Sequence, residues 1–167
     1  MTIISPLATL VLSAAAGLSP LSVQAAEGAT TTVYITGTLV DAPECNVNGN
    51  NAVDVDFGDN ITTRQIDGLN YKKQIVYTLS CSSMASNGMR VSVVGAQASF
   101  GNGLIGTDKT GLAIQLWNGS QKLANATMVD FTYPDIPELW ATPVAQDNTM
   151  LTAGTFSGNA SLIISYQ

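Results

Sequence analysis

The sequence predicts an all-β protein. Short segments that alternate between apolar and polar residues, or that are rich in β-branched residues, recur along the chain at 31–40, 52–57, 74–80, 89–95, 111–117, 127–133 and 155–166. Clusters of Asn, Gly, Asp and Pro separate these segments, and no window holds a sustained helical period, so one short helical turn near 61–67 is the most we expect. Strands at this spacing, together with two cysteines early in the chain, predict an immunoglobulin-like sandwich.

Residues 1–25 predict a secretory signal peptide. They contain no charged side chain and end in VQA, the small-x-small pattern that precedes cleavage, so we expect cleavage after Ala25 or, alternatively, after Ala26. The Lys or Arg that usually begins a signal is missing, which is compatible with a start upstream of Met1. A membrane anchor is disfavoured because two prolines, at positions 6 and 20, keep the apolar run short of the ~20 residues that a span needs.

Size and charge restrict the class of protein. After removal of the signal, roughly 140 residues remain, which is enough for one domain with a substantial core. The formal net charge is -6, and the six Lys and Arg are scattered apart from Lys72-Lys73. This distribution argues against a nucleic-acid partner or an anionic membrane surface, because both require a basic patch.

The first expected strand, residues 31–40, has an unusual face. Thr31, Val33, Ile35 and Leu39 alternate along it, but Gly37 occupies a position where a core side chain would be expected. Two explanations remain open at this stage: an ordinary first strand with a bulge at the glycine, or a strand whose partner lies outside its own domain.

The two cysteines, Cys45 and Cys81, predict one disulfide because the chain is expected to be exported. On the chain-entropy model, closing this loop contributes roughly 4 kcal/mol to stability. A metal site is not expected, since the chain has no His and no further cysteine pair.

Catalytic chemistry is also not expected. Without His, the chain has no Ser-His-Asp triad, no Cys-His pair and no imidazole base. Asp54, Asp56 and Asp59 lie close together, but they lack the arrangement of a calcium loop and are interpreted as a solvated strand edge. Residues 101–106 match G-x-G-x-x-G in letters only, because a turn and another strand follow them, so we expect a glycine-rich turn. Trp117 and Trp140 are interpreted as core or rim residues, with sugar stacking as the alternative.

The last segment, 155–166, is the most regular. One face carries Phe156, Gly158, Ala160, Leu162, Ile164 and Tyr166, and the other is mostly Ser, Thr and Asn. A terminal core strand explains this pattern, but a long terminal strand with an apolar face is also a surface that another strand could cover.

Four features together resemble the pilin subunits of the chaperone/usher family, which includes type 1 and P pili. They are the alternating extension with its inward glycine after a signal peptide, the Cys45 and Cys81 pair, Gly154 fourteenth from the C-terminus, and the penultimate Tyr166. The segments VDVDFGD, GLAIQLWNG and GTFSGNASLIISY also resemble pilin stretches in the same order. The resemblance covers nearly the whole chain after the signal.

The resemblance implies an incomplete immunoglobulin-like β-sandwich that lacks its last strand. It further implies an N-terminal donor-strand extension at 26–40 followed by a pilin domain at 41–167. The donor side chains would be Thr31, Val33, Ile35, Gly37 and Leu39. The acceptor groove would lie along the C-terminal strand, at Gly154, Phe156, Ala160, Leu162, Ile164 and Tyr166.

The function implied by the resemblance is that of a structural fimbrial subunit, not an enzyme, that polymerises by donor-strand complementation and supports cell adhesion. Its partners would be a periplasmic chaperone, an outer-membrane usher and neighbouring pilins, with no cofactor and a host receptor met only indirectly. The subunit would pass through the periplasm to the cell-surface fimbrium. The similarity leans toward a minor or adaptor subunit, with shaft and terminator roles open, and the alternative function is a lectin-like tip subunit that binds a host glycan directly.

Overall fold

The computed structural model describes residues 28–39 and 44–167. The predicted signal peptide, both alternative cleavage sites and the predicted boundary between residues 40 and 41 therefore lie outside the described residues. The chain divides into two compact units, Met1–Thr38 and Leu39–Gln167, which are treated separately below. Within the described ranges, no helix has the length and apolarity needed to cross a membrane.

The described part of the N-terminal extension, residues 28–39, is exposed along its whole length and forms no strand. The strand that the sequence predicts at 31–40 is therefore not found over 31–39. The alternating pattern is present, but a strand also needs a neighbouring backbone with which to exchange ladder hydrogen bonds.

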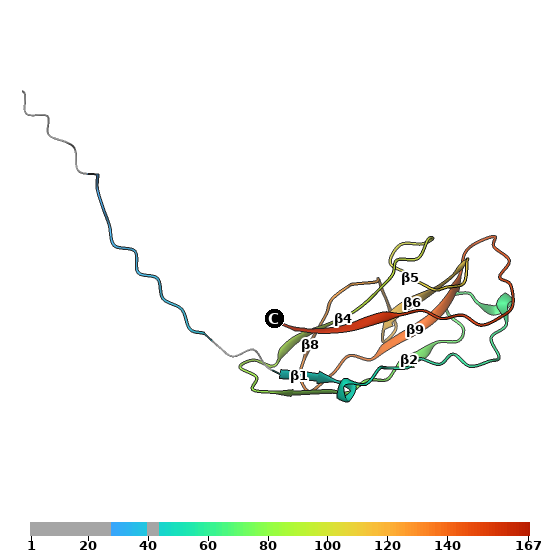
Figure 1. Ribbon diagram of the computed structural model, residues 1–167, viewed down its shortest axis with the longest axis horizontal. Helices are drawn as coiled ribbons and strands as arrows, with labels where there is room; N and C mark the ends of the chain where they lie inside the picture. Colours follow the sequence, from blue (N-terminus) through green and yellow to red (C-terminus); the bar gives the residue numbers. More distant parts are fainter. Residues whose placement is uncertain (1–27, 40–43) are drawn as a thin grey trace, which may run out of the picture. The chain divides into compact units, whose positions relative to one another are not determined.

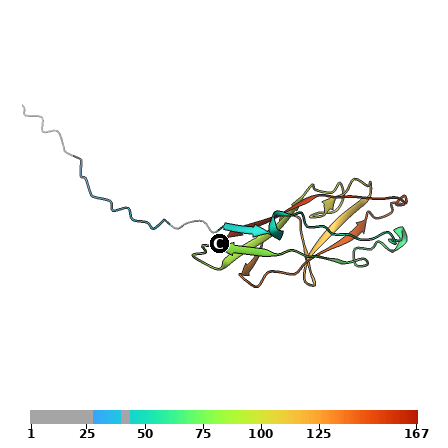
Figure 2. The same cartoon turned by 60° about the horizontal axis from the view of Figure 1, so that its bottom comes forward.

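The second unit consists of antiparallel strands in two larger sheets and one two-stranded ladder (Figures 1 and 2). The three-stranded sheet has the order β10-β4-β8, formed by Ala160–Tyr166, Gly88–Gly95 and Val129–Thr132. The larger sheet has the order β2-β9-β6-β5, formed by Lys73–Ile75, Leu139–Ala145, Leu112–Asn118 and Ile105–Gly106, and β7 (Gln121–Leu123) pairs with β6. The separate ladder joins β1 (Glu44–Val47) to β3 (Leu79–Ser82).

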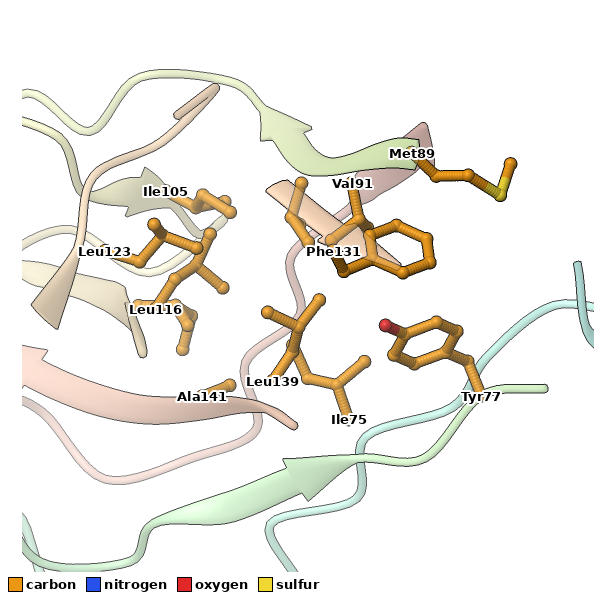
Figure 3. Close-up of a cluster of buried hydrophobic side chains, with 12 residues drawn as sticks. Ile75, Tyr77, Met89, Val91, Ile105, Leu116, Leu123, Phe131, Leu139 and Ala141 are labelled. Carbon is orange, nitrogen blue, oxygen red and sulfur yellow. The ribbon is translucent and has the colours of Figure 1, made fainter. Parts of the chain in front are cut away.

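The hydrophobic core lies between the two larger sheets. In Figure 3, Val91 of β4 and Phe131 of β8 face Ile75 of β2 and Leu139 of β9. Met89, Val91 and Leu139 are almost completely buried. Each of the two larger sheets turns one face toward this core, as expected for a sandwich of two packed layers.

Several strands were predicted correctly from their patterns. β4, β6 and β8 correspond to the segments expected at 89–95, 111–117 and 127–133. The helical turn expected near 61–67 is the 3-10 helix η2 (Thr63–Gln65). Residues 101–103 form a turn with positive φ at Gly101 and Gly103, so the glycine-rich stretch is a turn as predicted.

Other predicted strands differ from the structure in their presence or in their boundaries. Alternate residues of the segment 52–57 are partly buried, but this segment forms no ladder in the described structure. The strand expected at 74–80 is divided between β2 and β3, and β10 begins at Ala160, so residues 155–159 precede it. Four elements had no predicted counterpart: the strands β1, β5, β7 and β9. A further 3-10 helix, η1 (Asn48–Asn50), was also not predicted.

The predicted disulfide is confirmed. Cys45 of β1 and Cys81 of β3 are directly opposite each other in the antiparallel ladder, with their Cα atoms 4.1 Å apart. The bond therefore joins two strands that already pair. Both sulfur-bearing residues also pack against the edge of the core.

Candidate functional site at the free edge of the last strand

The most distinctive feature of the domain is the position of β10 at the edge of its sheet. β10 pairs with β4 along its full length, from Ala160 opposite Gly95 to Tyr166 opposite Met89. Among the described strands it has no neighbour on its other side. An edge strand presents a row of backbone N–H and C=O groups with which a further strand can pair.

The two faces of β10 differ in burial. Leu162 and Ile164 lie opposite the buried Val93 and Val91 and pack against the core while remaining partly exposed. Ile163 points to the opposite face and is 47% exposed. The apolar face that the sequence predicts for this segment is therefore present, but its core packing is incomplete.

A second group of partly buried apolar side chains lies on the extended segment 52–57. Val53, Val55 and Phe57 pack against the same core as Leu162 and Ile164. The ring of Phe57 contacts that of Phe156, with their centroids 5.9 Å apart. This contact brings the end of segment 52–57 beside the residues that precede β10. We call these partly buried side chains the apolar strip; its members are Val53, Val55, Phe57, Phe156, Leu162 and Ile164.

The other predicted acceptor residues lie around this strip. Ala160 and Tyr166 are the first and last residues of β10. Gly154 lies before the strand and has a φ of +126°, a backbone conformation that favours glycine. The structure therefore shows that the predicted acceptor residues belong to β10 and to the segment leading into it.

The predicted donor residues lie on the extension. Val33, Ile35 and Leu39 are 74%, 91% and 100% exposed, which is unusual for three apolar side chains so close in sequence. Gly37 has open space around the position that a Cβ would occupy, and its φ lies outside the left-handed range. Nothing in the described structure of this chain therefore requires glycine at position 37.

Two aspartates, one of them bonded to the segment that precedes β10, accept hydrogen bonds from backbone N–H groups. Asp108 accepts hydrogen bonds from the Ser157 backbone N–H at 2.8 Å and from the Ser157 hydroxyl at 2.9 Å. These two bonds lower the pKa of Asp108 below its ordinary value of 3.8. In the turn at 67–70, the backbone N–H groups of Asn70 and Leu69 similarly lower the pKa of Asp67.

The buried side chain of Tyr77 has a strongly shifted pKa. Burial raises the pKa of Tyr77 to about 12, and its hydroxyl donates a 3.0 Å hydrogen bond to the carbonyl oxygen of Pro137. Tyr77 therefore remains protonated at neutral pH and acts as a buried hydrogen-bond donor.

The two tryptophans lie side by side on β6 and β9, where Trp117 is opposite Trp140. Trp117 is only 7% exposed. The Lys72 ammonium lies 4.5 Å from the centroid of the Trp117 ring and 5.4 Å from that of Trp140, and it donates to the Gly119 carbonyl oxygen at 2.7 Å. The cluster thus braces the sheet through cation–π contacts, and its more buried ring is not a free platform for a sugar.

The structure offers little that resembles a catalytic or metal centre. In the ranges 28–39 and 44–167, no group of three or more acidic or cysteine side chains is placed to hold a metal ion. Asp54, Asp56 and Asp59 are exposed, and Asp56 accepts a hydrogen bond from the backbone N–H of Gly58. A pocket of about 310 Å³ lined by residues 96–99 and 106–112 contains none of the predicted acceptor residues.

Comparison with known proteins identifies the family. The sequence model of the family described as "Fimbrial protein" matches residues 33–167. The chain belongs to the fimbrial protein family. Two fimbrial-like proteins of Escherichia coli are similar to it: YfcR is 30% identical over 87% of each chain, and YfcQ is 33% identical over 78% of this chain and 84% of its own length.

Solved structures show the same fold. The P pilus adaptor subunit PapF aligns with a TM-score of 0.54 and 23% identity over 74% of this fimbrial protein and 95% of PapF. The P pilus rod subunit PapA aligns with a TM-score of 0.57 and 20% identity over 81% of this fimbrial protein and all of PapA. These structures confirm the all-β, immunoglobulin-like fold, and the family match above confirms the predicted fimbrial family.

Sequence reasoning did not find the bonds between Asp108 and Ser157. The two residues are 49 positions apart, and each belongs to an ordinary polar stretch. The only local signal was the group of turn-forming residues at 106–111, which predicts a turn but not a tertiary partner.

Proposed function

We propose that this fimbrial subunit joins its neighbours by strand exchange. The extension of one subunit, with Thr31, Val33, Ile35, Gly37 and Leu39 on its inward face, adds to the free edge of β10 in another. The observation that carries the proposal is that one chain combines an exposed, alternating apolar extension with a free edge strand that contributes two side chains to the apolar strip.

Both halves of the proposed contact supply a physical driving force. Burying Val33, Ile35 and Leu39 would stabilise the joined subunits by about 1.5 to 3 kcal/mol for each side chain. Backbone hydrogen bonds to β10 would add affinity and would fix the register of the added strand. In such an arrangement, Gly37 would mark a position where the incoming backbone passes close to the acceptor.

The proposed function includes the route of assembly. The chain would be exported after cleavage of residues 1–25, would be held by a periplasmic chaperone, and would reach the cell-surface fimbrium through an outer-membrane usher. The segment 26–40 would act as the donor extension and 41–167 as the acceptor domain. The subunit would support adhesion as part of the fibre, without catalysis of its own and with a host receptor met only indirectly.

Replacing Gly37 with a large residue tests the proposed exchange. We expect Gly37→Leu to leave the free energy of unfolding of the subunit unchanged, because the structure shows open space at this position. The same change should lower the equilibrium constant for polymer formation from purified subunits by about tenfold or more, since a clash of about 1.4 kcal/mol already costs a factor of ten in such a constant. Polymer formation is followed by size-exclusion chromatography.

Gly28→Leu is the matched control, because Gly28 also has open space around it and lies in the same extension but before the proposed donor residues. It should polymerise like the wild type. Normal polymerisation of the Gly37→Leu variant would contradict the assignment of the donor strand.

A further inference from the structure

The segment that leads into β10 is held by the opposite sheet. β10 pairs with β4 in the three-stranded sheet, whereas residues 153–158 contact the turn that follows β5 of the larger sheet. Asp108 and Ser157 share three hydrogen bonds: the two accepted by the carboxylate and one from the Asp108 backbone N–H to the Ser157 carbonyl oxygen at 2.9 Å. We call these three bonds the latch.

Neighbouring contacts reinforce the latch. Lys109 donates from Nζ to the Ala153 carbonyl oxygen at 3.2 Å. A Cβ added at Gly158 would lie 3.2 Å from the carbonyl oxygen of Gly106, so the two backbones approach closely at this point. The segment 153–158, which leads into β10, is therefore attached to the larger sheet both before and after Phe156.

The turn that carries Asp108 is itself held by hydrogen bonds. The Thr107 hydroxyl donates to the Leu112 carbonyl oxygen at 2.8 Å, and the backbone N–H of Leu112 donates to the Lys109 carbonyl oxygen at 3.1 Å. The backbone N–H of Gly106 donates to the Ala96 carbonyl oxygen at 2.7 Å. Asp108 thus projects from a fixed turn and not from a loose loop.

The latch acts next to the apolar strip. Ser157 directly follows Phe156, whose ring contacts Phe57, and the free edge of β10 begins shortly afterwards at Ala160. Residues 155–159 have no ladder to β4 that could hold them in place. Their position therefore depends on the latch and on the packing of Phe156.

We infer that Asp108 is a positioning residue for strand capture, because it fixes the start of the β10 edge and the Phe156 end of the apolar strip before a partner strand arrives. This inference rests on the proposed strand exchange. The physical reason is preorganisation: a segment that is already fixed in the bound conformation loses less conformational entropy on binding.

The test measures the binding of a partner strand to the full chain. A fluorescently labelled peptide with the sequence of residues 28–39 is titrated with wild-type protein, and fluorescence anisotropy reports binding. We expect Asp108→Ala to weaken binding by about tenfold, as expected for the loss of charge-assisted bonds that preorganise the site. Ser157→Ala retains both backbone N–H bonds of the latch and should weaken binding less.

Asp67→Ala is the matched control. Asp67 is also exposed and also accepts backbone N–H bonds within a turn, but those bonds lie within residues 67–70. This variant should bind the peptide like the wild type. Hydrogen exchange provides a second measurement: without peptide, the amides of residues 156–159 should exchange faster in Asp108→Ala than in Asp67→Ala.

The outcomes separate the inference from the function on which it rests. Equal peptide affinity of Asp108→Ala and the wild type would overturn the positioning role and leave strand exchange intact. An equal loss of affinity in both aspartate variants would also overturn it, because the effect would then reflect general stability. Failure of the wild type to bind the peptide would overturn strand capture at β10 itself. If Asp108→Ala does not fold, the Ser157→Ala variant decides between these outcomes.

Discussion

Two aspartates, Asp67 and Asp108, each hold a part of the backbone by accepting hydrogen bonds in their ionised form. Both carboxylates have a folded-state pKa below 3.8, and backbone N–H donors are the main cause at each site. A group with a depressed folded pKa stabilises the folded state above its unfolded pKa. The contribution is lost as the pH falls through the lower, folded value.

This sign leads to a prediction for acid stability. The free energy of unfolding should decrease on acidification below about pH 4, and Asp108→Ala and Asp67→Ala should each show a smaller decrease than the wild type. Urea denaturation at a series of pH values from about 6 to about 2 measures the effect. An identical pH dependence in the wild type and both variants would show that these hydrogen bonds do not contribute.

The roles of single residues could be predicted from the sequence to different degrees. The partner of Cys45 could be predicted because the chain has only one other cysteine. The partner of Asp108 could not, since many Ser, Thr and Asn residues offer similar donors and only the folded chain brings Ser157 to it. Gly37 was noticed because it interrupts an apolar face, which is a local property of the sequence.

At the scale of elements, the two faces of β10 should respond differently to substitution. Ile164→Ala should lower the free energy of unfolding by about 1 to 2 kcal/mol, because this side chain packs against the core but is only partly buried. Ile163→Ser, on the exposed face, should change it by no more than about 0.5 kcal/mol. Chemical denaturation measures both values, and a larger effect at Ile163 would contradict the orientation of the strand.

The segment 52–57 shows why alternation alone misled the prediction of strands. Val53, Val55 and Phe57 alternate along this segment, and in the structure all three pack against the core. It could not show whether another backbone lies alongside, and hydrogen-bond pairing depends on that neighbour. The same reasoning applies to residues 31–39, which alternate without any ladder of their own.

β9 is the opposite case: it forms ladders with two strands, but its sequence did not predict a strand. Its sequence contains Pro143, and proline normally argues against a central strand because it cannot donate a ladder hydrogen bond. In the structure, β2 pairs only with Leu139–Ala141, so Pro143 lies beyond the end of that ladder and has β6 as its neighbour. The ladder between β2 and β9 ends before Pro143, and this pairing depends on the tertiary structure, which local composition does not reveal.

For the whole molecule, the disulfide makes a testable contribution to stability. Its cysteines are separated by 36 residues, and a loop of this length predicts a contribution of about 4 kcal/mol on the chain-entropy model. Reduction, or the double variant Cys45→Ser with Cys81→Ser, should lower the free energy of unfolding by about 2 to 4 kcal/mol. Urea denaturation with and without reductant gives the value, and an unchanged midpoint would contradict the prediction.

The class of the whole fold was predictable because it depends on properties that are averaged over many residues. Frequent short alternating segments, many turn-forming residues and the absence of helical periodicity all indicated a sandwich. The distribution of the strands between sheets was not predictable in the same way, because the sequence does not show which strands pair and which strand lies at the edge of a sheet.

The free edge at β10 has a consequence for the geometry of assembly. In the proposed exchange, each copy gives one strand and accepts one, so the contact joins two different surfaces and has a direction. Contacts of this head-to-tail kind produce open chains whenever their rotation does not close a ring. A copy that uses only its extension and its β10 edge in this way extends a linear chain. Its two ends are chemically different, one with an unused extension and the other with an unfilled edge, and growth can therefore be started or stopped at one end without affecting the other.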